Sequence, residues 1–423
     1  MAIALTLARR LAPERRFLES SAILFVGTSI ARVLGFLFSV ASARFLLPAD
    51  YGVLAYALGV IGIASALPYT APTTLARYLA AHHSRSTEQD WYFSNWLAIV
   101  GLLVALSAAV ALPFVALSGL PPGMVAAILL NLLGAAVLEG YMGAARGLEA
   151  YARAAGFYVV ANAIQLVVIL ALSLAGRQSS LSFLLVYGVS SSIAVLMMQS
   201  VAPLQLAFRR GLVSRAPMLD IFKFMVPLLI QTVFYAGWFG ADILFLRRFE
   251  SEEALGTYAA AKVIMTVLIL APTAIGGVQL SRIARVPAHQ VPQTVIRAVA
   301  LTAAATLPST LFLALFGGFI GSHLYGGKYP LIGAPIPLLA LGTGLYCFYG
   351  VLTSTWVGLG HPRIYAIASG TAMAVTVLSD VLLVPSFGLI GAAGGFALGS
   401  AVQLAVVGTF TVWKFLGQHW YAS

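Results

Sequence analysis

The sequence predicts an all-α, polytopic membrane protein whose twelve transmembrane helices form two six-helix lobes. Three observations support this fold class: an apolar composition, a series of apolar runs of membrane-spanning length, and an internal repeat. Hydrophobic residues make up 61% of the 423 residues, charged residues only 9%, and the mean hydropathy is +0.96. Soluble domains carry about 25% charged residues. The composition therefore excludes soluble enzymes, nucleic-acid-binding proteins and disordered chains.

Each predicted helix is an apolar run bounded by charged residues or by glycine and proline. An α-helix crosses the hydrocarbon core of a bilayer with about 20 residues, and twelve runs of about this length follow one another along the chain. The connecting loops are too short to hold a soluble catalytic domain, so no enzymatic activity is expected. The predicted spans are 18–43, 50–75, 92–116, 122–145, 154–175, 181–206, 219–246, 254–280, 296–322, 331–358, 362–385 and 389–413.

The first run imitates a cleavable signal peptide, with arginines before it and Ala-Ser-Ala at residues 41–43 near its end. The apolar region of a signal peptide has about 7–15 residues. The run from Ser21 to Val40 is longer. We therefore expect a first transmembrane helix that is retained.

Basic residues gather on alternate loops and indicate which side of the membrane each loop faces. With the N-terminus in the cytoplasm, seventeen Lys and Arg residues fall on the cytoplasmic side and five on the other. Cytoplasmic loops of membrane proteins carry an excess of Lys and Arg, so both termini are expected in the cytoplasm. This bias accounts for the net charge of +11 without a nucleic-acid partner. The five residues on the other side are Arg44, Arg177, Arg247, Arg248 and Lys328.

An internal repeat relates two predicted lobes, 18–210 and 211–413, which lie between a cytoplasmic segment, 1–17, and a cytoplasmic tail, 414–423. A shift of 204 residues places the first two spans on the seventh and eighth. Six spans per half give both halves the same orientation, and parallel repeats with a cavity between them are a transporter architecture. The matched identities are Arg44 with Arg248, Phe45 with Phe249, Gly52 with Gly256, Ala55 with Ala259, Ala57 with Ala261, and Pro68 with Pro272.

The matched prolines, Pro68 and Pro272, interrupt the second and the eighth span. Matched breaks in corresponding spans point to the substrate cavity of a transporter. The alternative is that the two prolines only shape helix packing.

Two basic residues lie inside predicted spans, Arg32 in the first and Lys262 in the eighth. A charge at a helix centre in lipid costs roughly 2.5–3.5 kcal/mol, so such residues commonly serve a function. Because they come from different halves, we expect both in a central cationic cavity that binds an anionic group such as phosphate. The alternative is a structural role, in which each is paired with Asp242, Glu139 or a backbone carbonyl.

Three carboxylates, Glu139, Asp242 and Asp380, also fall inside spans and are candidates for proton or cation coupling. Asp242 and Asp380 lie nearer the ends of their helices, so solvation among the lipid headgroups is the alternative. The single cysteine, Cys347, excludes an intramolecular disulfide, and neither a metal site nor a cofactor is predicted. Glycines that recur every four residues on the last span predict close helix packing; they are Gly391, Gly395 and Gly399.

Three groups of segments form a pattern across nearly the whole chain. The first is Ala31–Phe36 with Ala43–Gly52, the second Pro227–Leu229 with Ala241–Leu246 and Leu255–Lys262, and the third Gly360–Arg363 with Val384–Ala393. In order and spacing they resemble the Wzx-type polysaccharide flippases, members of the superfamily that also contains the MATE drug exporters and the lipid II flippase.

This resemblance implies a MATE-like fold, alternating access, and transport of an undecaprenyl-diphosphate-linked oligosaccharide across the bacterial cytoplasmic membrane for surface polysaccharide biosynthesis. It implies membrane lipid, a polymerase or glycosyltransferases of the same pathway as partners, and H⁺ or Na⁺ as a coupling ion. Asp242 and Lys262 match expected family positions, and Arg32 matches a cavity position. At Asp380 the family more often has asparagine.

Two other functions compete with this interpretation. A MATE-like, cation-coupled multidrug exporter would carry dominant carboxylates in its cavity, whereas the deepest predicted charges here are basic and favour an anionic cargo. A membrane glycosyltransferase or polymerase would need catalytic acids or bases in a substantial outer loop, and the outer loops here are short.

Overall fold

The structure, a computed structural model, describes residues 2–81, 86–283 and 286–416. These residues form α-helices and short 3₁₀ turns, with no β-strand among them. Lipid offers no water to unpaired backbone groups, so helices are the expected form of a chain this apolar. The helices are α1 (Ala2–Phe45), α2 (Pro48–Ala64), α3 (Ala71–Ala81), α4 (Ser86–Ser118), α5 (Pro122–Gly147), α6 (Tyr151–Leu174), α7 (Ser180–Val201), α8 (Arg215–Phe249), α9 (Glu252–Met265), α10 (Leu270–Ile283), α11 (Val291–Leu324), α12 (Ile336–Gly358) and α13 (Arg363–Leu416).

Within the described ranges, ten helices are long and apolar enough to cross a membrane, or eleven when the bent pair α2–α3 counts as one span. The longest of them, α13, is a hairpin of two legs, 363–387 and 389–416, that turn at Gly388 with a φ of 52°. A Cβ atom on Gly399 would overlap the Thr376 side chain, so the two legs pack antiparallel. These legs correspond to the last two predicted helices. The total of twelve spans stays a prediction.

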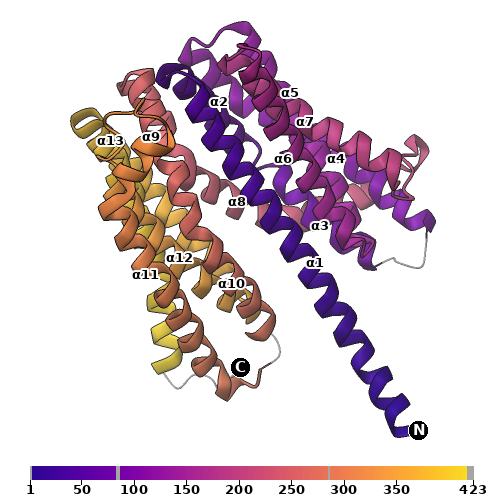
Figure 1. The fold of residues 1–423 in the computed structure, drawn as a ribbon. Coiled ribbons are helices and arrows are strands. Elements are labelled where there is room, and N and C mark those ends of the chain that lie inside the picture. The colour runs from indigo at the N-terminus through magenta and orange to yellow at the C-terminus, as the bar shows by residue number, and fades with distance from the viewer. Residues whose placement is uncertain (1, 82–85, 284–285, 417–423) are drawn as a thin grey trace.

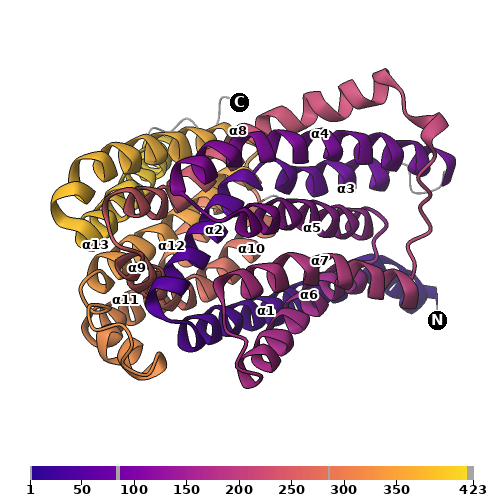
Figure 2. The same ribbon diagram turned by 90° about the horizontal axis from the view of Figure 1, so that it is seen from above.

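The helices form two bundles, which we call the N-lobe (α1–α7) and the C-lobe (α8–α13) (Figures 1 and 2). Both described chain ends lie on the same side, which we call the terminal end (Figure 1). The opposite, distal end carries the α1–α2, α8–α9 and α11–α12 connections. The predicted N-terminal segment is helical from Ala2 onward and continuous with the first span, and of the predicted tail only 414–416 is described, as the end of α13.

The long helix α8 connects the lobes. The segment before it is fixed to α4 of the N-lobe, where Asn95 donates to the Leu212 carbonyl at 2.9 Å and Asp90 accepts from the Ala207 amide at 2.8 Å. The first turns of α8 stay on the N-lobe, since the Tyr78 hydroxyl donates to the Asp220 carbonyl at 3.0 Å. The change from one lobe to the other therefore occurs within α8.

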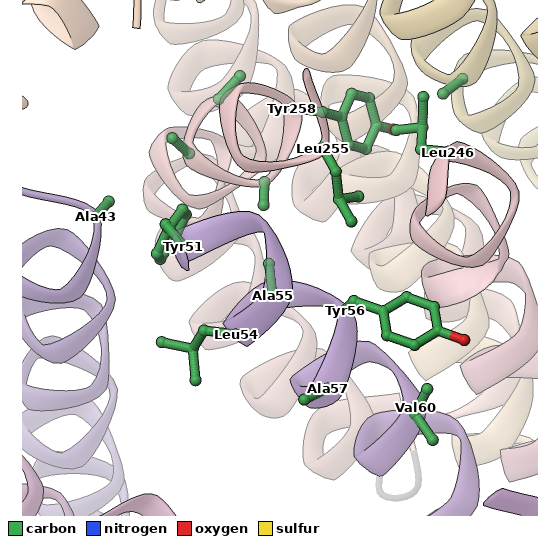
Figure 3. Close-up of a cluster of buried hydrophobic side chains, with 14 of the residues drawn as sticks. Ala43, Tyr51, Leu54, Ala55, Tyr56, Ala57, Val60, Leu246, Leu255 and Tyr258 are labelled. Atoms are coloured by element: carbon green, nitrogen blue, oxygen red, sulfur yellow. The ribbon is translucent and has the colours of Figure 1, made fainter. Parts of the chain in front are cut away.

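Three groups of buried apolar residues show how the lobes are joined. One core, at the distal end, contains residues of both lobes, such as Tyr51 and Leu54 of α2 with Leu255 and Tyr258 of α9 (Figure 3). The second core is made by the N-lobe and the first turns of α8, and the third by the C-lobe alone. The lobes therefore share one core at the distal end and have separate cores toward the terminal end.

The lobe junction has two-fold symmetry that follows the internal repeat. A Cβ atom on Gly52 would overlap the carbonyl oxygen of Glu252, and one on Gly256 would overlap that of Pro48. Both pairs are exchanged by the 204-residue shift, so the same contact occurs twice with the halves interchanged, as at an isologous interface. Only glycine permits so close an approach of α2 and α9.

Hydrogen bonds to helix-end carbonyls hold the distal end together. Arg44, at the end of α1, donates to the Leu324 carbonyl of α11 at 2.8 Å, and Lys328 donates back to the Arg44 carbonyl at 2.7 Å. In the other half, Arg247 at the end of α8 donates to the Ser118 carbonyl of α4 at 3.2 Å. Cations at helix C-termini also interact favourably with the helix dipole.

Both spans that contain the matched prolines are interrupted. A 3₁₀ turn, η1 (Pro68–Thr70), separates α2 from α3 at a bend of 55°, and η3 (Thr266–Ile269) separates α9 from α10 shortly before Pro272. Proline cannot donate the backbone hydrogen bond that would continue a helix. The two breaks lie beside the two cavities described next.

Candidate substrate cavity and buried charges

Arg32 lines a cavity of about 300 Å³ between the lobes. One wall is the face of α1 that carries Arg32, Phe36 and Ser39, and the other is formed by α9, η3 and α10, with Thr266 and Leu270 among its residues. Residues three, four and seven apart lie on one helix face, so these three residues of α1 face the cavity together. Apart from Arg32 and two hydroxyl groups the walls are apolar.

The Arg32 side chain is exposed, and among the described residues it has no ion-pair partner. The structure therefore places Arg32 where the sequence predicted, between the lobes. Its role there is untested.

Lys262 is placed differently from the prediction. Its ammonium group lies 2.7 Å from the Asp242 carboxylate, donates to the Phe239 carbonyl, and faces the rings of Phe239 and Phe396 at 4.4 and 5.0 Å. The side chain is buried inside the C-lobe. The expectation that Lys262 shares one cavity with Arg32 is therefore not met, because the nearby carboxylate of α8 holds the ammonium group within its own lobe. These contacts agree with the structural alternative for Lys262, in which it pairs with Asp242 or with a backbone carbonyl.

Asp242 and Asp380 are both fully buried, so neither is solvated among the headgroups. Asp242 accepts a 2.5 Å hydrogen bond from the Tyr258 hydroxyl in addition to its ion pair with Lys262. Asp380, on the first leg of α13, has no hydrogen-bond partner for either carboxylate oxygen among the described residues. The negative charge of Asp242 is thus neutralised, while Asp380 remains an unpartnered carboxyl group in the same lobe.

Glu139 lies apart from these residues, on α5 in the N-lobe, where it is buried and accepts a hydrogen bond from the Tyr158 hydroxyl of α6. The three carboxylates therefore belong to two lobes. Over the described part of the chain, no group of three or more His, Cys, Asp and Glu side chains is arranged to hold a metal ion.

A second cavity, of about 190 Å³, lies inside the N-lobe against a neighbouring face of the same α1 segment. Its polar lining consists of uncharged groups. Gly35 and Ser39 line both cavities, so the two adjoin at this part of α1. The polar residues that line it are Ser39, Tyr69, Asn162, Gln165 and Tyr187.

Sequence reasoning missed this second cavity because it followed charges only. Asn162 and Gln165 are amide side chains three residues apart within an apolar span, and this spacing puts them on one helix face. Polar groups that face lipid are costly. The pair was therefore a usable signal for a polar cavity.

The repeated glycines of the last span pack against the first leg of α13, as expected. Cβ atoms on Gly391, Gly395 and Gly399 would overlap Leu383, Asp380 and Thr376 in turn. The glycine stripe thus brings the second leg directly against the Asp380 carboxyl group.

These features define a two-lobed, multi-pass membrane protein with a cavity between its lobes. The chain belongs to the family described as polysaccharide biosynthesis protein, which residues 17–280 match. No curated protein matches the chain in sequence.

Solved structures with the same fold are transporters. The lipid II flippase MurJ in an inward closed conformation superposes with a TM-score of 0.76 at 14% identity, covering 92% of this chain and 87% of that one. An inward-facing multidrug resistance MATE family transporter of the MOP superfamily gives 0.70 at 14% identity, covering 95% and 100%. A MOP superfamily transporter from Pyrococcus furiosus gives 0.66 at 13% identity, covering 96% of each chain. The fold is therefore that of the MOP transporters.

Proposed function

We propose that this protein is a flippase that moves an undecaprenyl-diphosphate-linked oligosaccharide across the bacterial cytoplasmic membrane for surface polysaccharide biosynthesis. The observation that carries the proposal is the exposed, unpaired Arg32 guanidinium in the cavity between the lobes. Membership of the polysaccharide biosynthesis protein family supports the class of substrate.

The chemistry of such a substrate suits this cavity. A diphosphate and its sugars cannot cross the hydrocarbon core unaided, whereas the polyprenyl tail is stable in lipid. Arginine binds phosphate oxygens through two parallel, charge-assisted hydrogen bonds. The apolar side chains around Arg32, among them Val33, Val267 and Leu270, accept the first units of the tail.

The excess of basic residues supports a cytoplasmic location for the terminal end. In that orientation the shared core and the Arg44, Lys328 and Arg247 hydrogen bonds close the outer side. The substrate enters between the lobes from the inner leaflet, and transport requires these outer contacts to open. A polymerase or glycosyltransferases of the same pathway act on either side of this step.

Arg32→Gln should lower export of the surface polysaccharide by about tenfold or more, since a charge-assisted hydrogen bond contributes about 1.5–3 kcal/mol. The measurement is complementation of a deletion strain of the native host, scored as surface polysaccharide per amount of membrane-inserted protein. Because Arg32 has no partner among the described residues, the protein level should not change.

Arg177→Gln is the matched control, because Arg177 is exposed at the α6–α7 turn, outside the cavity. Full export by the Arg32→Gln variant would remove the residue from the mechanism. If the unmodified protein expels cationic drugs, and neither it nor any variant restores polysaccharide export, the result would instead indicate a multidrug exporter.

Asp380 supplies the group that couples transport to H⁺ or Na⁺. Its carboxyl oxygens are buried and unpartnered, whereas Asp242 is already neutralised by Lys262. Glu139, which is buried in the N-lobe, is a second candidate site for a proton.

Asp380→Asn should abolish the response of transport to an imposed ion gradient without lowering thermal stability. Asparagine has the same shape and removes a buried group that is costly to ionise. The measurement is substrate translocation in proteoliposomes under a pH or a Na⁺ gradient, with thermal unfolding in parallel. An unchanged response to both gradients would exclude Asp380 as the coupling group.

A further inference from the structure

We infer that the N-lobe cavity binds the sugar unit directly attached to the diphosphate, and that this sugar is uncharged. The inference rests on the proposed function and deepens it by naming the class of sugar. The geometry behind it is the adjoining position of the two cavities on neighbouring faces of α1.

The two cavities meet at one helical turn. Gly35 and Ser39 line both, and Arg32 lies one turn before Gly35 on the same face of α1. A phosphate group bound at Arg32 therefore has the N-lobe cavity beside it. A group that is covalently attached to that phosphate would therefore enter the N-lobe cavity.

Gly35 leaves space at the point where the two cavities adjoin. A Cβ atom at this position would lie only 2.9 Å from the Asn162 side-chain oxygen. Any larger residue would therefore push against Asn162 and narrow the connection. This is a second reason, besides helix packing, for glycine at this turn of α1.

The lining of the N-lobe cavity matches a neutral sugar. Amide side chains both donate and accept hydrogen bonds, and the Asn162 and Gln165 amides are joined there by the hydroxyl groups of Tyr69 and Tyr187. The Gln165 side chain is 4% exposed, and its carbonyl oxygen has no partner among the described residues. An unmade hydrogen bond in a buried place is costly, so a sugar hydroxyl or acetamido N–H that donates to it would be bound favourably.

The size and the charge of the cavity narrow the ligand further. Its 190 Å³ is below the roughly 300–1,000 Å³ of pockets that hold drug-sized ligands, so it fits one sugar unit and not a whole oligosaccharide. None of its lining residues is charged. No cation therefore lines this cavity to pair with the carboxylate of an acidic sugar.

The test measures binding of short-chain lipid probes to the purified full-length protein in nanodiscs. The probes are farnesyl diphosphate and farnesyl diphosphate carrying glucose, galactose, N-acetylglucosamine or glucuronic acid. At least one neutral sugar probe should bind about tenfold or more tightly than farnesyl diphosphate, because hydrogen bonds to the sugar are added. The glucuronic acid probe should gain nothing.

The variants Asn162→Leu and Gln165→Leu should each remove this gain while leaving the affinity for farnesyl diphosphate unchanged. Gly35→Leu, whose side chain would press on Asn162 where the two cavities adjoin, should act in the same way. Arg32→Gln should weaken all probes together. The matched control is Gln403→Leu, since Gln403 is likewise a buried glutamine whose side-chain oxygen lacks a partner among the described residues, but it lies in the C-lobe on α13.

Three results would overturn the inference. The first is that no neutral sugar improves on farnesyl diphosphate in the unmodified protein. The second is that the glucuronic acid probe binds most tightly. The third is that the leucine variants in the N-lobe weaken farnesyl diphosphate as much as the sugar probes. If no probe binds at all, the proposed function fails as well, and this outcome is distinct from the other three.

Discussion

Replacing Lys262 by methionine should lower the free energy of unfolding by about 3–5 kcal/mol, because removing one partner of a buried ion pair leaves an uncompensated charge. Asp242 is fully buried and would lose its only cation, although the Tyr258 hydrogen bond would remain. The expected observation is a markedly lower yield of monodisperse protein and a lower midpoint of thermal unfolding in detergent. Tryptophan fluorescence is a suitable probe, since Trp238 packs near this cluster.

A second substitution, at Asp242, distinguishes an ion pair from apolar packing of the Lys262 side chain. Lys262→Met combined with Asp242→Leu should restore most of the lost stability, because replacing both partners by apolar groups is often nearly neutral. Lys223→Met is the matched control, since Lys223 is an exposed lysine of α8. If Lys262→Met alone were as stable as the unmodified protein, the ion pair between Lys262 and Asp242 would not contribute to stability.

Gly52→Ala and Gly256→Ala should each destabilise the closed distal end, and by similar amounts. Each new methyl group would overlap a backbone carbonyl oxygen, of Glu252 or of Pro48, which cannot rotate away as a side chain does. Overpacking of this kind costs typically 1–3 kcal/mol, and the structure can relieve it by moving α2 away from α9. We therefore expect a shift toward a state that is open at this end.

Spin labels can measure this shift as a distance between the lobes. Gln178 in the N-lobe and Leu331 in the C-lobe are both exposed at the distal end, and the buried Cys347 can be replaced by alanine before labelling. Gly101→Ala is the matched control, because nothing lies within 4 Å of a Cβ atom at that helical glycine. Unchanged distances in both glycine variants would show that the α2–α9 contact does not hold the distal end closed.

The fold was largely predictable because lipid imposes strong constraints on a chain. Runs of about 20 apolar residues can only cross as helices, so the spans and the two lobes followed from composition and spacing. The hairpin at Gly388 also matched a predicted boundary between 385 and 389. The sequence did not predict that α8 begins on one lobe and ends in the other, because this depends on tertiary contacts of Asn95 and Asp90.

The candidate site was predictable only in part. Arg32 was assigned to a cavity because it is a charge inside an apolar span, and the structure has it in the lining of the cavity between the lobes. Lys262 was assigned to the same cavity from its positive charge and from the half of the chain in which it lies. The direction of its side chain was not predicted. The side chain turns toward Asp242, which is 20 residues away in sequence and adjacent in space. No periodicity in the sequence reports such a choice between two faces of a short helix.

The reciprocal contact of Gly52 with Glu252 and of Gly256 with Pro48 has an evolutionary consequence. On a symmetry axis a residue contacts its own counterpart. In a half-length ancestor that paired with a second copy, one substitution at this contact would therefore have changed both sides of it. Fusion of the two copies into one gene removes that restriction. In this chain the two sides differ, with proline at 48 and glutamate at 252, whereas both halves have glycine at the position that sets the helix separation.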